Sequence, residues 1–363
     1  MSTTLPIPRG AADVTHHWLQ AALGSNGVTV VVEDVEVAPI GTGQTGATFR
    51  ITPRYADAEH DFPSTFVIKL PAGDDGVRAG VTLGYLSEVA FYRNAAEQTS
   101  VPTPRCFYSD ITEDGAEFAL LLSDLSPAIP GDQVAGCDTV AARQAVTALA
   151  GLHGPSWCDP RWLDLAVAMP KPGDTAAAGG LGDVARMAAG ITLDKLGTRM
   201  DRRDRDTFRD ALNLVTPWLR AEADTGRFAL LHGDYRLDNL MFDSATDRVS
   251  VVDWQTLGIG LPARDLAYFT ATSLDPDTRA AAEHGLVDAY HRTLLDFGVT
   301  GYTPETCWQD YRFGMVQAPL IVALGAAFAT PTARGEEIFL VMLERSCRAI
   351  RELGTLALID AAA

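Results

Sequence analysis

The stretch LLHGDYRLDNLMF (residues 230–242), followed after a turn by VSVVDWQ (residues 249–255), decides the fold of this chain. The apolar runs on both sides of a turn over residues 243–248 are typical of the short strands of a hairpin, and strand ends hold polar loop residues at fixed positions. Asp234 precedes Asn239 by five residues, and Asp253 follows Asn239 by fourteen. Two carboxylates and one amide supply hard oxygen ligands for Mg²⁺ and leave one carboxylate as a general base. The structural alternative is a set of turn-forming and helix-capping side chains.

The character of the chain changes near its middle. β-branched runs separated by Gly, Pro and Asp predict strands over residues 28–32, 35–40, 66–70 and 118–122. Periodic Ala- and Leu-rich stretches predict helices over residues 141–152, 204–223, 279–297 and 336–358. The sequence therefore predicts an α+β fold with a small β-rich lobe over residues 1–123 and a larger helical lobe over residues 124–363. A cleft between two lobes is the usual place for a ligand.

A glycine-rich loop, GTGQTG (residues 41–46), lies in the β-rich part. Its glycines Gly41, Gly43 and Gly46 carry no β-carbon, so backbone N–H groups can approach phosphate oxygens. A dinucleotide fold needs a helix after such a loop, whereas the next six residues read as a strand closed by Pro53. A loop between two strands suits a flap over ATP. A turn that binds no ligand is the alternative.

The strand FVIKLP (residues 66–71) carries one charge on an otherwise apolar segment. Alternation places Lys69 on the face opposite Phe66 and Ile68, where its ammonium needs a partner. Glu88 lies in a predicted helix and has no basic residue three or four positions away to pair with. We therefore expect a Lys69–Glu88 ion pair. A Glu88 that simply faces water is the alternative.

Charge and composition exclude several classes of function. The net charge of −18 repels nucleic-acid phosphates and anionic membranes, so neither is an expected partner. Excess carboxylate favours a cationic substrate or serves solubility alone. The five cysteines show no paired spacing for a metal or a redox dithiol and read as buried thiols in a reducing compartment.

The ends and the most apolar segment of the chain bear on localisation. The first ten residues contain no apolar stretch of signal-peptide length, which favours a cytoplasmic protein. Residues 313–330 carry no formal charge, which touches the lower limit for a membrane span. Because Gln317 and Pro319 interrupt this segment and no second one resembles a span, we expect a buried helix.

With these motifs the sequence resembles the phosphotransferase family that includes aminoglycoside phosphotransferases, choline kinases and ecdysteroid-kinase-like proteins. The resemblance covers nearly the whole chain, because the glycine loop, Lys69, Glu88, the HGD segment and DLAYF (residues 265–269) follow the family's order. It implies a protein-kinase-like fold with ATP between the two lobes.

The resemblance also implies a role for each matched residue. Asp234 would be the catalytic base, and Asn239 and Asp253 would hold Mg²⁺. Lys69, positioned by Glu88, would contact the ATP phosphates. The backbone of Ser123 and Leu125 would meet the adenine edge.

Several residues depart from the protein-kinase motifs, and these departures limit the kind of molecule that can accept the phosphoryl group. Gly233 stands where protein kinases carry Arg, and only eleven residues separate Asp253 from Asp265, too few for an activation loop and a peptide-docking segment. A small-molecule acceptor is therefore expected. We interpret His153 and His232 as structural residues and Asp265 as the cap of a helix that begins at Leu266.

The predicted activity is Mg²⁺- and ATP-dependent phosphorylation of a hydroxyl group on a small molecule. A catalytically idle nucleotide-binding module and a metal-dependent hydrolase built on His232, Asp234 and Asp253 are the alternatives. Residues 162–200 and the helices after Asp275 are expected to form the acceptor pocket. Aminoglycosides suit the acidic chain, but the motifs are closer to the ecdysteroid-kinase-like branch, and no motif encodes the acceptor or an oligomeric state.

Overall fold

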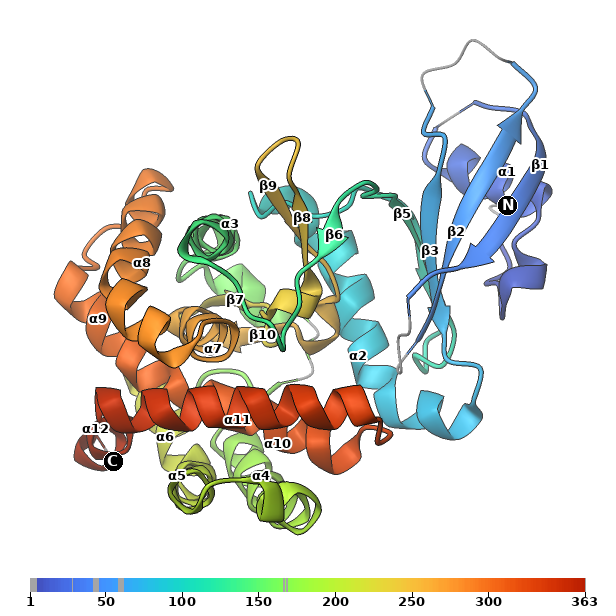
Figure 1. The fold of residues 1–363 in the computed structure, drawn as a ribbon. Helices are drawn as coiled ribbons and strands as arrows, with labels where there is room; N and C mark the ends of the chain where they lie inside the picture. The colour runs from blue at the N-terminus through green and yellow to red at the C-terminus, as the bar shows by residue number, and fades with distance from the viewer. Residues whose placement is uncertain are drawn as a thin grey trace. The chain divides into compact units, whose positions relative to one another are not determined.

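The computed structural model describes residues 5–27, 29–41, 46–57, 62–165, 167 and 169–362. The chain divides into two compact units (Figure 1). The first comprises Met1–Glu97 and Thr103–Pro127, and the second comprises Gln98–Pro102 and Ala128–Ala363. The first is built on an antiparallel sheet and the second is mainly helical, which confirms the predicted α+β class.

The described residues of the first unit form a five-stranded antiparallel sheet with the strand order β1-β2-β3-β5-β4. Its strands are β1 (Val32–Pro39), β2 (Gly46–Tyr55), β3 (Phe66–Pro71), β4 (Cys106–Ile111) and β5 (Phe118–Ser123). Its helical segments are η1 (Ala11–Asp13), α1 (His16–Ser25), α2 (Asp75–Asn94) and η2 (Ala96–Gln98).

The core of the first unit lies between α1 and one face of the sheet. Trp18 and Leu19 of α1 pack with Ile51 of β2 and with Phe66 and Ile68 of β3, all of them buried. This packing follows the period-2 alternation of a strand, whose successive side chains point to opposite faces. The apolar face of β3 is thereby fixed, and its polar face is left for Lys69, as the sequence predicts.

Two strand predictions in this unit are corrected. Residues 29–31 are outside any strand, and β1 begins at Val32, which is paired with Tyr55. β-branched residues favour a strand only where an adjacent strand offers backbone groups for hydrogen bonding. β2 also continues through Pro53, which was expected to close it. Because β3 pairs with β2 only as far as Ile51, the missing N–H of Pro53 costs no bond to β3.

The second unit combines helices with short strands. Its strands are β6 (Ile129–Pro130), β7 (Ala229–Leu231), β8 (Leu240–Asp243), β9 (Arg248–Val251) and β10 (Gly258–Gly260). Its α-helices are α3 (Thr139–Ser156), α4 (Thr175–Leu196), α5 (Arg202–Asn213), α6 (Val215–Asp224), α7 (Ala263–Ser273), α8 (Pro276–Asp296), α9 (Pro304–Phe313), α10 (Gln317–Phe328), α11 (Ala333–Leu353) and α12 (Thr355–Ala362). Its 3-10 turns are η3 (Pro160–Asp164), η4 (Gly197–Arg199), η5 (Leu237–Asn239), η6 (Trp254–Thr256) and η7 (Gly314–Val316).

Two predicted helices are each split in the structure. The predicted helix over residues 204–223 is interrupted at Leu214, where α5 ends and α6 begins. The predicted helix over residues 336–358 is interrupted at Gly354, whose φ of 65° ends α11 in the left-handed conformation. Glycine adopts this conformation without a steric cost and commonly terminates helices. Apolar periodicity persists across both breaks, so periodicity alone did not locate them.

The uncharged segment 313–330 lies mostly within α10. Among the described residues, Pro304–Phe328 is the stretch of helix that is long and apolar enough to cross a membrane, and 61% of its apolar window is buried inside the protein. Leu320, Val322 and Ala323 of α10 are buried. This burial is what the prediction of a core helix requires.

All five cysteines are free thiols. Cys307 and Cys347 are buried, whereas Cys106, Cys137 and Cys158 are partly exposed, so the prediction of buried thiols holds for two. Burial raises the pKa of the Cys307 thiol to about 12. A thiol with such a pKa stays protonated and unreactive near neutral pH.

Candidate active site

The catalytic-loop segment (residues 232–239) connects β7 to β8, and β8 forms an antiparallel hairpin with β9 in which Leu240 faces Val251. The hairpin predicted from the two apolar runs is therefore confirmed. The backbone N–H of Val252 donates to the carbonyl of Asn239 at 3.0 Å. This bond places Asn239 and Asp253 at the same end of the hairpin, next to the catalytic-loop segment.

Three side-chain donors among the described residues hold Asp234. The phenol of Tyr268 donates to Asp234 Oδ1 at 2.5 Å. The guanidinium of Arg236 and the amide of Asn239 both donate to Asp234 Oδ2 at 3.1 Å. Because the side chain retains 20% exposure, a partner can still reach the carboxylate. The structure thus brings together Asp234 and Asn239, as the sequence predicts.

Arg236 is shared between two carboxylates. It pairs with Asp234 through Nε and with Asp238 through Nη1, the latter at 2.6 Å. Burial alone would lower the pKa of Arg236, but the negative charge of Asp234, aided by Tyr268 and Asp238, raises it above its ordinary value. The guanidinium therefore remains a permanent cation beside Asp234.

Tyr268 remains a hydrogen-bond donor for a related reason. Burial, and then the negative charge of Asp234, raise the pKa of the Tyr268 phenol well above its ordinary value. The residue is fully buried. Its O–H is therefore intact at neutral pH and donates to the carboxylate.

Asp265 has a role other than the predicted one. It does not cap α7, which begins at Ala263 with Pro262 at the N-cap position. Its carboxylate accepts from the backbone N–H of His232 at 2.6 Å and of Gly233 at 3.0 Å. A carboxylate inside the first turn of a helix can point away from the helix end, and here it fixes the backbone of the catalytic-loop segment.

Both histidines interpreted as structural are buried, and both ring nitrogens of each lie within hydrogen-bonding distance of a partner. His153 Nδ1 lies 2.7 Å from the hydroxyl of Tyr290, and His153 Nε2 lies 3.4 Å from Asp265. His232 Nε2 lies 3.0 Å from the carbonyl of Val252, and Nδ1 accepts from the N–H of Asp234. His232 therefore joins the catalytic-loop segment to the strand that leads to the second aspartate.

Gly233 is conformationally required. Its φ is 82°, and a β-carbon at this position would lie 2.3 Å from the carbonyl oxygen of Thr256. The carbonyl of Gly233 accepts from the amide of Gln317 at 2.8 Å. An Arg at this position, as in protein kinases, is therefore incompatible with the backbone of this chain.

The residues proposed for a metal are Asn239 and Asp253. Asn239 uses its amide nitrogen on Asp234, so its oxygen is directed elsewhere, and among the described residues no donor to this oxygen is recorded. Asp253 adopts the left-handed conformation with φ 67° and ψ 71°. One amide oxygen and one carboxylate suit a hard divalent cation that keeps water and phosphate ligands. In the described part of the chain, no group of three or more His, Cys, Asp or Glu side chains is arranged so that it could hold a metal ion by itself.

Lys69 and Glu88 form an ion pair in the first unit, as predicted. The ammonium lies 2.6 Å from Glu88 Oε1 and 2.7 Å from Oε2. Glu88 is fully buried and Lys69 retains 16% side-chain exposure. Glu88 therefore does not face water, and the pair holds the end of the Lys69 side chain in one place.

The glycine loop is described only at its ends. Gly41 has a φ of 73°, which favours glycine, and a β-carbon on Gly46 would lie 3.1 Å from the carbonyl of Leu70. Gly43 lies outside the described residues. The structure thus explains why glycine occurs at both ends of the loop, and the phosphate contact of the loop stays a prediction.

The predicted adenine-contacting segment follows β5. The N–H of Ser123 donates to the carbonyl of Arg105 at 2.8 Å, and its hydroxyl accepts from the N–H of Arg105 at 3.0 Å. Asp124 pairs with Arg50 at 2.6 Å. The Ser123 side chain is thereby committed to the sheet, and a role of Ser123 and Leu125 toward adenine stays a prediction that concerns their backbone.

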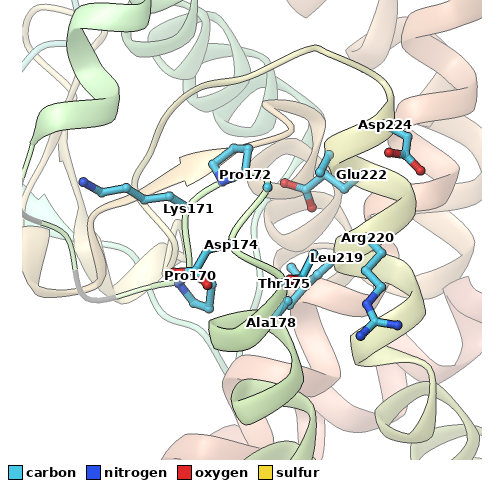
Figure 2. Close-up of a pocket in the computed structure, with 12 residues that line it drawn as sticks. Pro170, Lys171, Pro172, Asp174, Thr175, Ala178, Leu219, Arg220, Glu222 and Asp224 are labelled. Atoms are coloured by element: carbon cyan, nitrogen blue, oxygen red, sulfur yellow. The ribbon is translucent and has the colours of Figure 1, made fainter.

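A cavity of about 260 Å³ lies in the second unit (Figure 2). One wall is the segment that leads into α4, and the other is α6. The lining residues are Pro170, Lys171, Pro172, Gly173, Asp174, Thr175, Ala178, Leu219, Arg220, Glu222, Ala223 and Asp224. The first seven of them fall inside the range 162–200 in which we expect the acceptor pocket.

Three residues around Asp234 were given no role by the sequence reasoning. Tyr268 follows Asp265 by one helical turn, so the spacing alone could have indicated that both reach the same loop. Arg236 lies two residues after Asp234 and could have been noticed as the nearest cation. Gln317 is 84 residues from Gly233, and no local pattern could have indicated their contact.

The antiparallel sheet with its Lys–Glu ion pair, together with the HGD loop and the following hairpin, defines a kinase-like phosphotransferase. The model of the family described as "Phosphotransferase enzyme family" matches residues 36–303. The chain belongs to this family.

Solved structures share the fold of this chain. A provisionally assigned aminoglycoside phosphotransferase from Ralstonia eutropha superposes with a TM-score of 0.55 and 18% identity, over 92% of this chain and 97% of that one. The ethanolamine kinase of Plasmodium vivax superposes with a TM-score of 0.51 and 11% identity, over 97% of this chain and 93% of that one. At these identities the comparison concerns the fold alone, and it confirms the predicted protein-kinase-like fold.

A curated relative matches a shorter segment. Acyl-CoA dehydrogenase family member 11 of Gallus gallus is 34% identical over 87 residues, which are 23% of this chain and 11% of that protein. The match thus spans about a tenth of the relative's length.

Proposed function

We propose that this protein transfers the γ-phosphoryl group of Mg²⁺-ATP to a hydroxyl group of a small molecule. The observation that carries the proposal is the Asp234 carboxylate, tied to Asn239 and Arg236 inside a loop whose backbone is fixed by Asp265. Membership of the phosphotransferase family supports the same reaction class. An idle nucleotide-binding module would not need a carboxylate so closely restrained.

Asp234 accepts the proton in this mechanism. The acceptor hydroxyl loses its proton to the carboxylate as its oxygen forms a bond to the γ-phosphorus. The bond from that phosphorus to the β–γ bridging oxygen breaks, and ADP leaves with the bond electrons. Proton transfer to a positioned base accelerates such reactions by roughly 10²- to 10⁴-fold.

The other residues bind and orient the nucleotide. Asn239 and Asp253 would hold Mg²⁺, which supplies positive charge for the phosphate oxygens. The Lys69 ammonium, fixed by Glu88, would contact the phosphates. Gly41, Gly43 and Gly46 would cover the phosphates with backbone N–H groups, and the backbone of Ser123 and Leu125 would meet the base.

ADP release from Mg²⁺-ATP tests the proposal. The acceptor panel contains an aminoglycoside, ethanolamine and a hydroxylated acyl-CoA, the classes suggested by the similar proteins, together with other hydroxylated metabolites. We expect acceptor-dependent ADP release and a phosphorylated product detected by mass spectrometry. Release of phosphate from a phosphorylated compound without ATP would instead indicate the hydrolase.

Two variants separate chemistry from binding. Asp234→Asn is expected to abolish transfer while ATP still binds in a calorimetric titration, and Asp253→Ala is expected to weaken Mg²⁺-ATP binding itself. Asp243→Asn, which changes a partly exposed carboxylate at the end of β8 that accepts from the N–H of Ala245, is the matched control. Equal turnover by wild type and Asp234→Asn would refute the assignment of the base. ATP binding without turnover for every acceptor would favour the idle module.

A further inference from the structure

The two carboxylate oxygens of Asp234 accept different numbers of hydrogen bonds. A carboxylate has about four acceptor positions, two on each oxygen. Oδ2 accepts from Arg236 and from Asn239, which occupies both of its positions. Within the described part of the chain, Tyr268 is the one donor to Oδ1. The position that stays open for a further O–H therefore lies on Oδ1, the oxygen that Tyr268 holds.

Tyr268 is itself rigidly placed. It is fully buried in α7, where the surrounding protein atoms restrict its ring. Asp265, one turn earlier on α7, holds the backbone N–H groups of His232 and Gly233. One helix therefore fixes both the backbone before Asp234 and the Oδ1 atom of its side chain.

We propose that Tyr268 is a positioning residue that aims the open acceptor position of Asp234 Oδ1 at the acceptor hydroxyl. This inference rests on the proposed function, because it assigns the atom that takes the proton. The phenol keeps its own proton, and the proton of the acceptor goes to Oδ1. Without the phenol, the carboxylate can rotate about its Cβ–Cγ bond toward Arg236, and the open position no longer faces the hydroxyl.

The test compares Tyr268→Phe with Tyr311→Phe. Tyr311 is an equally buried phenol that donates to a carboxylate, Glu283 Oε2, at 2.9 Å, and accepts from the hydroxyl of Thr270 at 3.0 Å. The rate is measured with the best acceptor from the panel, or with water as the acceptor by phosphate release from Mg²⁺-ATP. A misplacement of about 1 Å at a reacting group costs up to about 100-fold. We expect Tyr268→Phe to lower kcat by about 10- to 100-fold at an unchanged KM for ATP, and Tyr311→Phe to keep kcat within twofold.

A third variant guards against loss of folding. Incorporation of 4-aminophenylalanine at position 268 keeps the ring and an N–H donor, so it is expected to restore most of the lost kcat. Thermal melting shows whether each variant is folded. If Tyr268→Phe does not fold, the 4-aminophenylalanine variant decides, since activity supports the proposal and inactivity in a folded protein overturns it.

The failures are distinguishable. An active wild type with a fully active Tyr268→Phe variant overturns the role of Tyr268 and leaves the kinase assignment intact. Equal losses in Tyr268→Phe and Tyr311→Phe would show a structural effect and would also overturn it. A wild type that neither transfers phosphate to the panel nor hydrolyses Mg²⁺-ATP overturns the proposed function, and the role of Tyr268 with it.

Discussion

Replacement of Gly233 by Ala tests whether the catalytic-loop segment is as constrained as its geometry indicates. The φ of 82° is unfavourable for an L-residue by roughly 1–2 kcal/mol. The new β-carbon would lie 2.3 Å from the carbonyl oxygen of Thr256, which is backbone and cannot rotate away. Overpacking of this kind costs typically about 1–3 kcal/mol more. We therefore expect a total loss of about 2–5 kcal/mol in the free energy of unfolding.

The matched control is Gly298→Ala. Gly298 has a φ of 87°, but no atom lies within 4 Å of its β-carbon position, so only the backbone cost applies. Since about 1 kcal/mol shifts the melting temperature of a unit of this size by roughly 2–4 °C, the two variants should melt about 2–12 °C apart. Circular dichroism during heating measures the difference. Equal melting temperatures would refute the steric argument, and full phosphotransferase activity in Gly233→Ala would show that the loop backbone tolerates displacement.

Three further predictions concern buried charges and the nucleotide. Burial raises the pKa of Asp124, but hydrogen bonding to the Arg50 guanidinium outweighs burial, so the net pKa is lowered. The ion pair should therefore stabilise the protein at pH values above the ordinary carboxyl pKa of about 3.9. The difference in melting temperature between wild type and Asp124→Asn should disappear as the pH falls below this value. A gap that persists at pH 2 would contradict this. Arg264→Met should lower the free energy of unfolding by about 3–5 kcal/mol because it leaves the buried Glu222 carboxylate without a counter-charge. In a urea titration, the double variant with Glu222→Gln should recover part of this loss. If it recovers nothing, the unpaired charge is not the cause. Lys69→Ala should raise the Kd of ATP by about tenfold, the effect of losing one charge-assisted contact, and an unchanged Kd in calorimetry would remove Lys69 from the nucleotide site.

Local sequence patterns predicted the structure correctly where it depends on residues close together in the sequence. The alternation around Lys69 correctly gave the two faces of β3, and the apolar runs around residues 243–248 correctly gave the β8–β9 hairpin. The split helices were missed because Leu214 and Gly354 interrupt the backbone without interrupting the apolar period.

The surroundings of Asp234 required tertiary information. Asp265 was expected to cap its own helix, since a carboxylate in the first turn commonly does so. Its partners are instead backbone groups 32 and 33 residues away. Tyr268 and Gln317 reach the same loop from α7 and α10, and no local pattern indicates the contact of Gln317.

The sequence by itself determined the class of fold, the hairpin, the Lys69–Glu88 pair and the candidate base, because periodicity and motif spacing are properties of neighbouring residues. Only the tertiary structure decided how Asp234 is held, since Arg236 and Asn239 of the same loop act together with Tyr268 of α7, which lies 34 residues away in the sequence. Packing brings such groups together, and the energy of each contact depends on burial and distance, which a linear sequence does not record.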